Sequence, residues 1–322
     1  MLLISFPLFP ARASTIAGSV DALFFFLIGV TVFFSTLIFL CIAYLAIKYR
    51  RRSDDEVPAE IHGSLPLEIV WTAIPLGIVA VMFFWGAKLF LSEMRAPANA
   101  MPVYVVGKQW MWKVQHPEGK SEINELHVPL GVPVRLILTS EDVIHDFAVP
   151  AFRIKRDVLP GRYTSEWFQA TKTGEFHLFC NQYCGTQHSA MIGRVVVMEP
   201  SDFQSWLASD PRTPTMAASG RKLYASLNCA TCHNDRLRAP SLDGSFGTIV
   251  DLQGGQTARE DEAYVRESLL NPRAKIVRGY PPVMPTYQGQ LNETEILQLI
   301  AYMQSLGGGE PRAAGAKGET VP

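Results

Sequence analysis

The chain has 322 residues and a formal net charge of −1, so it is long enough for two or three domains and gives no reason to expect a polyanionic partner. Hydrophobic residues make up 48% of the sequence and charged residues only 18%, which is unusually apolar for a wholly soluble protein. Much of this excess lies within the first 91 residues, which indicates membrane spans near the start of the chain.

Two apolar runs in this part each have the length of a transmembrane helix. Residues 22–46 contain no charged side chain and residues 69–90 contain a single lysine, so either run can cross a hydrocarbon core about 30 Å thick. Basic residues within 48–55 place the loop between them on the cytoplasmic side. We therefore predict a two-helix transmembrane hairpin over residues 22–92, with the N-terminus and all later residues outside.

Residues 1–21 form an N-terminal segment before the first span. They contain an apolar stretch and the sequence Ala11-Arg12-Ala13, which is similar to a short signal peptide with its cleavage site but lacks a basic start. Cleavage and retention of this segment both stay open.

Residues 97–203 predict a β domain. Runs at 133–139, 176–179 and 192–198 combine β-branched residues with alternation, and 143–147 is a further candidate strand. Glycine and proline punctuate the stretches between these runs. Several short strands over about a hundred residues are typical of a β-sandwich.

Residues 214–307 predict a helical domain that follows a proline-containing linker. Asn292 and Glu295 have the spacing of a capping box, and apolar residues then recur at helical intervals up to Leu306, where glycines follow. The tail 308–322 is predicted to be disordered because it offers almost no apolar surface to bury.

The pentapeptide Cys229-Ala230-Thr231-Cys232-His233 is the attachment signature of a c-type haem. Its two thiols bond covalently to the porphyrin, and the adjacent histidine becomes an axial ligand of the iron. The rival interpretation, a thioredoxin-like dithiol, needs a βαβ context that the surrounding sequence lacks. The sequence thus predicts one covalent haem c.

A methionine is the expected sixth ligand of a haem with a high potential. Of the two methionines after the pentapeptide, Met303 lies on the apolar face of the last predicted helix, where core packing explains it. Met284 lies beside prolines that stiffen its loop, so we predict Met284 as the ligand. The carbonyl of Pro240 is predicted to orient the ring of His233.

A twelve-residue segment gathers the soft and borderline donors that copper prefers, namely Cys180, Cys184, His188 and Met191. His145, on the candidate strand, supplies a second imidazole. A mononuclear blue-copper site uses one cysteine, so the second cysteine favours two copper ions that share both thiolates, each capped by one histidine. A disulfide between Cys180 and Cys184 would leave the two histidines and the methionine without a role. A zinc site would leave Met191 without a role, because zinc in proteins is bound by cysteine, histidine and carboxylates.

The remaining histidines and one further cysteine lack such partners. The histidines are interpreted as structural or exposed, and they are His62, His116, His127 and His177. Cys41 lies within the first apolar run and is interpreted as a small hydrophobic residue.

Together these features resemble subunit II of the haem–copper cytochrome c oxidases, in the version with a cytochrome c domain fused at the C-terminus. The resemblance covers residues from about 15 to 306, with the hairpin, the β domain and the haem domain in the family's order. Its most specific motif is the Cys-x3-Cys-x3-His-x2-Met string. It implies a multidomain membrane protein with a two-helix transmembrane hairpin, a cupredoxin-like Greek-key β-sandwich and an all-α class I cytochrome c domain.

The resemblance also implies a dinuclear copper centre, CuA, in which Cys180 and Cys184 bridge the two ions. The ligands that match the family pattern are His145, Cys180, Cys184, His188, Met191 and the backbone carbonyl of Gln182. Many relatives have glutamate at this last position, and its side chain helps to hold magnesium at the interface with subunit I. Glutamine cannot supply a carboxylate, which makes a magnesium ion doubtful here.

Two further residues match functional positions of the family. Trp110 matches the residue through which electrons enter from soluble cytochrome c, although a tethered haem allows another entry point. Glu68, three residues before Trp71, matches a carboxylate at the mouth of a proton pathway into subunit I. The alternatives, an ordinary core tryptophan and a solvated glutamate at a membrane boundary, stay open.

By this resemblance the chain is the electron-input subunit of a proton-pumping terminal oxidase in the bacterial inner membrane, with its metal domains on the periplasmic side. An external cytochrome or membrane redox complex would reduce the haem c, and electrons would pass through CuA to haem in subunit I for reduction of oxygen to water. Subunits I and III are the implied partners, and the reducing site for oxygen lies on subunit I.

Other protein classes share part of this pattern. Nitrous oxide reductase carries the same copper centre but needs a large histidine-rich domain, which seven histidines cannot supply. A nitric oxide reductase subunit would share the ligands, and a free-standing membrane-tethered redox shuttle would need no partner, so both stay open. Quinol oxidase subunits have lost the copper ligands that this sequence contains.

Overall fold

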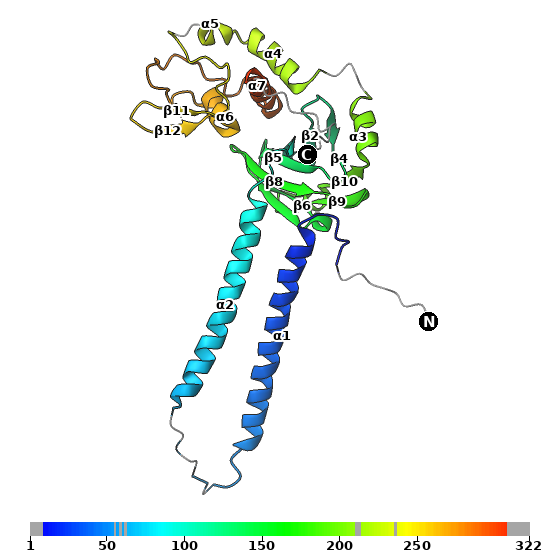
Figure 1. The fold of residues 1–322 in the computed structure, drawn as a ribbon, viewed down its shortest axis with the longest axis vertical. Helices are drawn as coiled ribbons and strands as arrows, with labels where there is room; N and C mark the ends of the chain where they lie inside the picture. Colours follow the sequence, from blue (N-terminus) through cyan, green and yellow to red (C-terminus); the bar gives the residue numbers. More distant parts are fainter. Residues whose placement is uncertain are drawn as a thin grey trace, which may run out of the picture. The chain divides into compact units, whose positions relative to one another are not determined.

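The computed structural model in Figure 1 describes residues 9–54, 56–57, 60, 63–209, 214–234 and 237–307. The chain divides into two compact units, of which one spans residues 15–95 and the other joins the residues before 15 to those after 95. The residues before 15 and those after 95 therefore belong to the same unit. A hairpin that starts and ends on one side of a membrane requires this. His62 and the predicted tail 308–322 lie outside the described residues.

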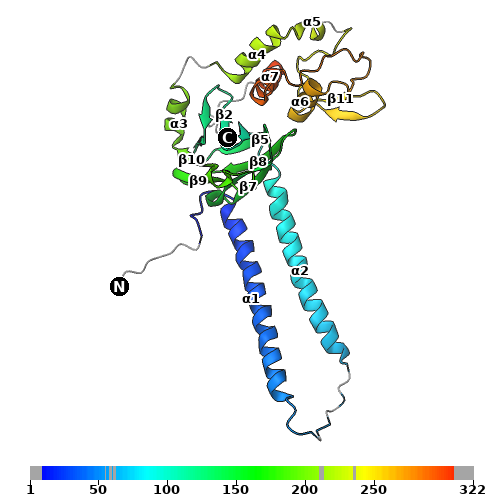
Figure 2. The ribbon, with the colours of Figure 1, turned by 180° about the vertical axis from the view of Figure 1, so that it is seen from behind.

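The helical unit consists of α1 (Ala17–Lys48) and α2 (Leu65–Glu93). Both helices are long and apolar enough to cross a membrane. They run side by side in opposite directions in both views of the ribbon (Figure 1, Figure 2), and the rings of Phe26 and Trp85 pack with centroids 5.6 Å apart. Both predicted spans are thereby confirmed as helices, and each helix extends beyond its apolar run at both ends.

A β-sandwich of two five-stranded sheets opens the second unit, with strand orders β3-β2-β1-β5-β8 and β4-β10-β9-β6-β7. Its strands are β1 (Met101–Lys108), β2 (Met111–Gln115), β3 (Ser121–Ile123), β4 (Glu125–Pro129), β5 (Pro133–Ser140), β6 (His145–Val149), β7 (Ile154–Val158), β8 (Thr164–Gln169), β9 (Gly174–Cys180) and β10 (Ile192–Met198). Two 3₁₀ turns accompany them, η1 (Pro150–Phe152) and η2 (His188–Ala190). The predicted sandwich is thus confirmed.

The candidate strand 143–147 begins later than the sequence indicates, at His145. The reason is a local turn in which the Ser140 hydroxyl donates to the carbonyl of Val143 over 2.5 Å, while the amide of Val143 donates to Asp142 over 2.7 Å. Short polar side chains that bond to nearby backbone compete with strand pairing. The turn therefore takes the first two residues of the run out of the sheet.

The chain segment before α1 lies against the sandwich. The amide of Ala13 donates to the carbonyl of Ala151, and its own carbonyl accepts from the amide of Thr171, each over 2.9 Å. The hydroxyl of Ser14 donates to the carbonyl of Phe152 over 2.7 Å. Ala13 is fully buried, so cleavage after this residue would cost the sandwich a buried residue and both backbone hydrogen bonds.

The later part of this unit is mainly helical, with α3 (Pro200–Leu207), α4 (Met216–Ser226), α5 (Ala230–His233), α6 (Glu262–Leu270) and α7 (Glu293–Leu306). Helices α4 and α7 pack closely, since a Cβ on Gly220 would lie 1.9 Å from the carbonyl oxygen of Gln298. The predicted capping box between Asn292 and Glu295 is present at the start of α7. A glycine at position 220 is therefore required by the helix–helix contact.

A short two-stranded sheet interrupts the helices of this domain, formed by β11 (Ile249–Asp251) and β12 (Thr257–Arg259). The sequence does not predict it, because three-residue strands are too short to produce a periodic pattern. The helical domain is otherwise as predicted.

A buried carboxylate joins two histidines that the sequence leaves without partners. Oε1 of Glu122 lies 2.9 Å from Nε2 of His116, Oε2 of Glu122 contacts Nδ1 of His127, and the ring of His127 stacks on Trp206 of α3. Burial alone would raise the pKa of Glu122, but the bonds to both histidines lower it to about 2. These two histidines are therefore structural, as interpreted, through one shared carboxylate.

We expect Glu122→Gln to destabilise the sandwich by about 3 kcal/mol, because an amide cannot accept from both rings and leaves a buried network broken. Because the folded-state pKa lies below the ordinary value of 4.5, the stabilisation is present above about pH 4.5 and is lost as the pH falls toward about 2. Thermal unfolding of the copper- and haem-loaded protein measures the loss. Glu125→Gln, which removes a surface ion pair with Arg194, is the matched control and should change stability by less than about 1 kcal/mol.

Candidate copper centre and haem site

Adjacent strands and one loop bring the predicted copper ligands together. His145 begins β6 and Cys180 ends β9, and these strands pair antiparallel, so that Phe147 lies opposite Cys180. The loop after β9 returns through η2, and the amide of Cys180 donates to the carbonyl of Met191 over 3.0 Å. This backbone closure makes a ring of residues 180–191 whose donor side chains converge.

The sulfur and nitrogen donors lie within contact distance of one another. Sγ of Cys180 and Sγ of Cys184 are 3.7 Å apart, well beyond the bond length of about 2.05 Å in a disulfide. Nδ1 of His145 lies 3.9 Å from Sγ of Cys180, and Nδ1 of His188 lies 3.5 Å from Sγ of Cys184. Sδ of Met191 is 3.9 Å from Sγ of Cys184. Each thiol thus faces one imidazole, and no disulfide joins the pair.

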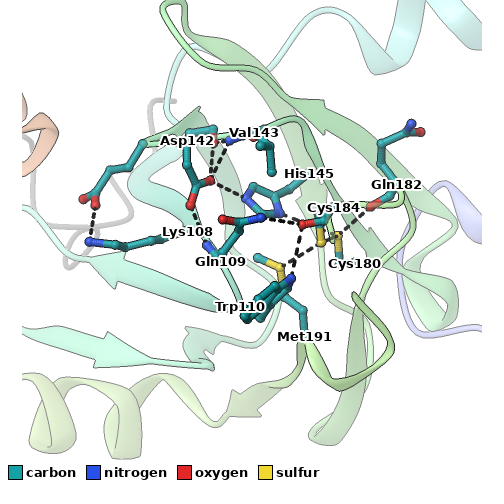
Figure 3. A network of polar contacts seen from close by, with 12 residues as sticks. Lys108, Gln109, Trp110, Asp142, Val143, His145, Cys180, Gln182, Cys184 and Met191 are labelled. Atoms are coloured by element: carbon teal, nitrogen blue, oxygen red, sulfur yellow. Dashed lines mark hydrogen bonds and ion pairs between the residues drawn. The ribbon is translucent and has the colours of Figure 1, made fainter. Parts of the chain in front are cut away.

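The spacing suits metal ions held between the two sulfurs. Two sulfurs 3.7 Å apart could both bind the same metal ion. The backbone carbonyl of Gln182 lies 3.3 Å from Sγ of Cys180, whereas its side-chain amide points away from the thiols (Figure 3). Two thiols, two imidazoles and a thioether form a donor set that copper prefers, so the residues fit this metal.

The two thiols differ in acidity although they share one environment. Burial raises the pKa of a thiol, but at Cys180 hydrogen bonds with His145 and with the backbone overcome this and lower the pKa. Burial and the neighbouring Cys180 raise the pKa of Cys184. One thiolate therefore forms readily, and binding of a cation is needed to expel the second proton.

Asp142 orients His145, a role that was not predicted from the sequence. Nε2–H of His145 donates to Oδ1 of Asp142 over 2.9 Å, which leaves Nδ1 to face Cys180 (Figure 3). Burial alone would raise the pKa of Asp142, but hydrogen bonds from the amide of Gln109 and from His145 lower it. A carboxylate three residues before a candidate metal-binding histidine is the signal that could have revealed this role.

Gln109 and Trp110 hold the copper loop from outside. Nε2 of Gln109 and Nε1 of Trp110 donate to the same carbonyl oxygen, that of Cys184, over 2.9 and 3.2 Å (Figure 3). Gly185 permits this approach, because a Cβ there would lie 3.0 Å from the Gln109 side chain and 3.1 Å from the Trp110 ring. Trp110 is partly exposed, and its role in electron entry stays a prediction.

A pocket of about 380 Å³ lies beside the haem-attachment pentapeptide. Cys229, Cys232 and His233 line it, and α5 places them on one helical turn. Nδ1–H of His233 donates to the carbonyl of Pro240 over 3.0 Å, as predicted, which leaves Nε2 free to bind iron. Burial lowers the pKa of His233, so its ring is neutral, as a metal ligand must be.

Both candidate methionines line this pocket. Met303 belongs to the buried core of α7, whereas Met284 is half-buried in its proline-flanked loop. The other lining residues are mostly apolar and include Val265, Leu269 and Leu299. An apolar pocket with an imidazole, two thiols and a thioether in its wall fits a haem, and the choice of Met284 stays a prediction.

Glu68 lies in the helical unit, away from the copper and haem ligands in sequence. It occupies the first turn of α2, where its amide donates to the carbonyl of Ser64 over 2.9 Å, and its side chain is exposed. An exposed carboxylate is compatible with both alternatives for this residue, so its role in a proton pathway stays a prediction.

Known protein families match three successive parts of the chain. Residues 4–89 match the transmembrane domain of cytochrome c oxidase subunit II, residues 120–199 match its periplasmic domain, and residues 217–307 match cytochrome c. A cytochrome c oxidase subunit 2 from Thermostichus vulcanus is 30% identical over 271 residues, which cover 65% of this chain and 82% of that protein. The chain belongs to the cytochrome c oxidase subunit II family.

Further similar proteins carry the same name. Cytochrome c oxidase subunit 2 from Alkalihalophilus pseudofirmus is 28% identical over 290 residues, 84% of this chain and 82% of that protein. The crystal structure of the periplasmic domain of subunit II from Bradyrhizobium japonicum is 35% identical and is matched over 96% of its length and 36% of this chain, with a TM-score of 0.35. The family matches and the relatives make this chain a cytochrome c oxidase subunit II, in which the cytochrome c domain implies haem and the subunit II domain implies copper.

Proposed function

We propose that this subunit II receives electrons from an external donor at a covalent haem c and passes them through a dinuclear copper centre to haem in subunit I, where oxygen is reduced to water and protons are pumped. The observation that carries the proposal is the pair of buried thiols 3.7 Å apart, each facing one imidazole. A pair at this distance is too far apart for a disulfide and well placed to share two ions.

The residues of the copper site act by fixing the donors before a metal arrives. Cys180, Cys184, His145 and His188 would hold two copper ions, which the two thiols would share. The further donors are Met191 and the carbonyl oxygen of Gln182. When bound, such a centre supplies one-electron redox chemistry. Asp142 and the backbone closure of the loop keep the donors in place, which limits the structural change that accompanies each electron.

The residues of the haem site divide into attachment and ligation. Cys229 and Cys232 would bond to the porphyrin, and His233 and Met284 would supply the ligands of the iron. The carbonyl of Pro240 fixes the orientation of the His233 ring through the hydrogen bond to Nδ1. A thioether ligand raises the potential of a haem with one histidine, which suits a site that accepts electrons from a respiratory donor.

The proposed setting is the bacterial inner membrane, with the copper and haem domains on the periplasmic side. Subunit I, and with it subunit III, are the proposed partners, and Glu68 is proposed as a proton-pathway entry toward subunit I. Trp110, partly exposed and bonded to the carbonyl of Cys184, is proposed as an electron entry for soluble donors. A magnesium ion stays doubtful because the Gln182 side chain is an amide and points away from the thiols.

Purification of the complex from its membrane tests this function. The proposal predicts that the chain co-purifies with a many-span haem protein and that the complex consumes oxygen with a cytochrome donor. Consumption of nitric oxide without oxygen uptake would assign the chain to a nitric oxide reductase. Purification of the chain alone, with both pigments but no partner, would favour a membrane-tethered shuttle.

A further inference from the structure

We infer that β1 forms the internal electron route between the haem pocket and the copper site, so that electrons from the tethered haem bypass Trp110. This inference rests on the proposed function and names the residues that couple its two sites. It follows from the position of β1, whose two faces contact the two sites in turn.

The outer face of β1 packs against the cytochrome c domain. Tyr104 and Val106, two residues apart and thus on one face of the strand, are only 1% and 3% exposed and belong to one buried cluster with α7. That cluster contains Leu299 and Met303, which also line the haem pocket. The hydroxyl of Tyr104 donates to Oε1 of Gln304, the neighbour of Met303, over 3.2 Å. Packed side chains thus connect the pocket wall to β1.

Polar contacts hold this arrangement. Arg266 of α6 forms an ion pair with Glu293 of α7, and its Nη1 donates to the carbonyl of Gly161 in the sandwich over 2.7 Å. The amide of Met216 at the start of α4 donates to the carbonyl of Pro117 over 3.0 Å. The cytochrome c domain therefore contacts the sandwich through buried and hydrogen-bonded groups within one compact unit.

The inner face of β1 touches a copper ligand one residue later. A Cβ on Gly107 would lie 2.9 Å from Cδ2 and 3.3 Å from Cγ of His145, so the backbone of Gly107 is in contact with the imidazole. His145 in turn faces Sγ of Cys180 over 3.9 Å. The path from the haem pocket to the copper ligand thus runs through Val106, one peptide bond and Gly107.

The buried cluster that reaches the haem pocket includes residues of β1 but not Trp110. Trp110 is partly exposed. Electron tunnelling weakens steeply across gaps and water and is stronger through bonded and closely packed atoms. The transfer oxidises the haem iron and reduces the copper centre by one electron, and no bond or proton is exchanged. The tethered haem therefore uses β1, and Trp110 remains for donors in solution.

The test measures the rate at which an electron, injected by light into the haem c of the purified oxidase, reaches the copper centre. We expect Val106→Glu, which buries a charge against α7, to slow this transfer by about tenfold or more. Val106→Ala opens a smaller gap and should slow it less. Trp110→Phe removes the hydrogen bond to the Cys184 carbonyl and should slow reduction by a soluble donor, but it should slow the internal transfer less than Val106→Glu does. Ile123→Glu adds the same charge to an exposed position on β3 of the same sheet and is the matched control.

Hydrogen exchange of β1 and α7 supplies a second readout that does not depend on turnover. Exchange should rise in Val106→Glu and stay unchanged in Ile123→Glu, while the haem spectrum and the copper signal of both variants keep their shape. The inference would be overturned if the internal rate is unchanged in both Val106 variants. It would also be overturned if Trp110→Phe slows this rate as much as Val106→Glu does. Failure of the unmodified protein to pass the electron at all would instead refute the proposed function.

Discussion

Cys180→Ser is expected to convert the copper centre from two ions to one. The substitution leaves a donor set of one thiolate, two imidazoles and one thioether, supplied by Cys184, His145, His188 and Met191, which is the set of a mononuclear blue-copper site. Cys184 keeps its contacts to His188 and Met191, at 3.5 and 3.9 Å, so one ion still has ligands. Metal analysis should find about half of the unmodified copper content, and electron transfer to subunit I should be lost.

The control for this change is Cys41→Ser. Cys41 is an exposed thiol of α1 and belongs to the helical unit rather than to the sandwich. The same substitution at this position should leave copper content and spectrum unchanged. Retention of the full copper content in Cys180→Ser would show that the two thiols do not share the metal.

Met284→Leu should leave the haem covalently attached and change its iron coordination. The bonds through Cys229 and Cys232 do not involve this residue, and His233 keeps its hydrogen bond to Pro240. Loss of the thioether should lower the midpoint potential by on the order of 0.1 V, because a methionine ligand raises the potential of a histidine-ligated haem. Redox titration of the visible spectrum measures this shift, and the slower acceptance of electrons from the donor follows from it.

Met303→Leu is the matched control, since Met303 lines the same pocket from the buried face of α7. A leucine of similar volume should cost less than about 1.5 kcal/mol and leave the potential unchanged. A shifted potential in this variant, with none in Met284→Leu, would assign the axial ligand to α7 instead.

The features that the sequence predicts depend on residues that lie close together in the chain. The apolar runs became α1 and α2, the alternating run at 133–139 became β5, and the spacing of Asn292 and Glu295 gave a capping box. The copper donors from Cys180 to Met191 lie within one short segment, and their side-chain types are those that copper prefers. The sequence is therefore enough to predict that they bind one metal centre.

The contacts that the sequence does not predict depend mostly on distant strands lying next to each other. Gln109 meets the copper loop only because distant strand ends converge, whereas Asp142 and Glu122 lie within six residues of the histidines that they bond. The contact of Gly107 with His145 requires β1 and β6 to face each other across the sandwich. The contacts of Gln109 and Gly107 have no periodic or local signature, so they become visible only in three dimensions.

Electron paramagnetic resonance of the copper-loaded protein tests the central claim most directly. The arrangement of Cys180 and Cys184, each facing one histidine, predicts a spectrum in which one unpaired electron is shared equally by two copper nuclei. Metal analysis of the same sample should give two coppers for each chain. The spectrum of a single, isolated copper ion would contradict a dinuclear centre and with it the proposed path of electrons through this subunit.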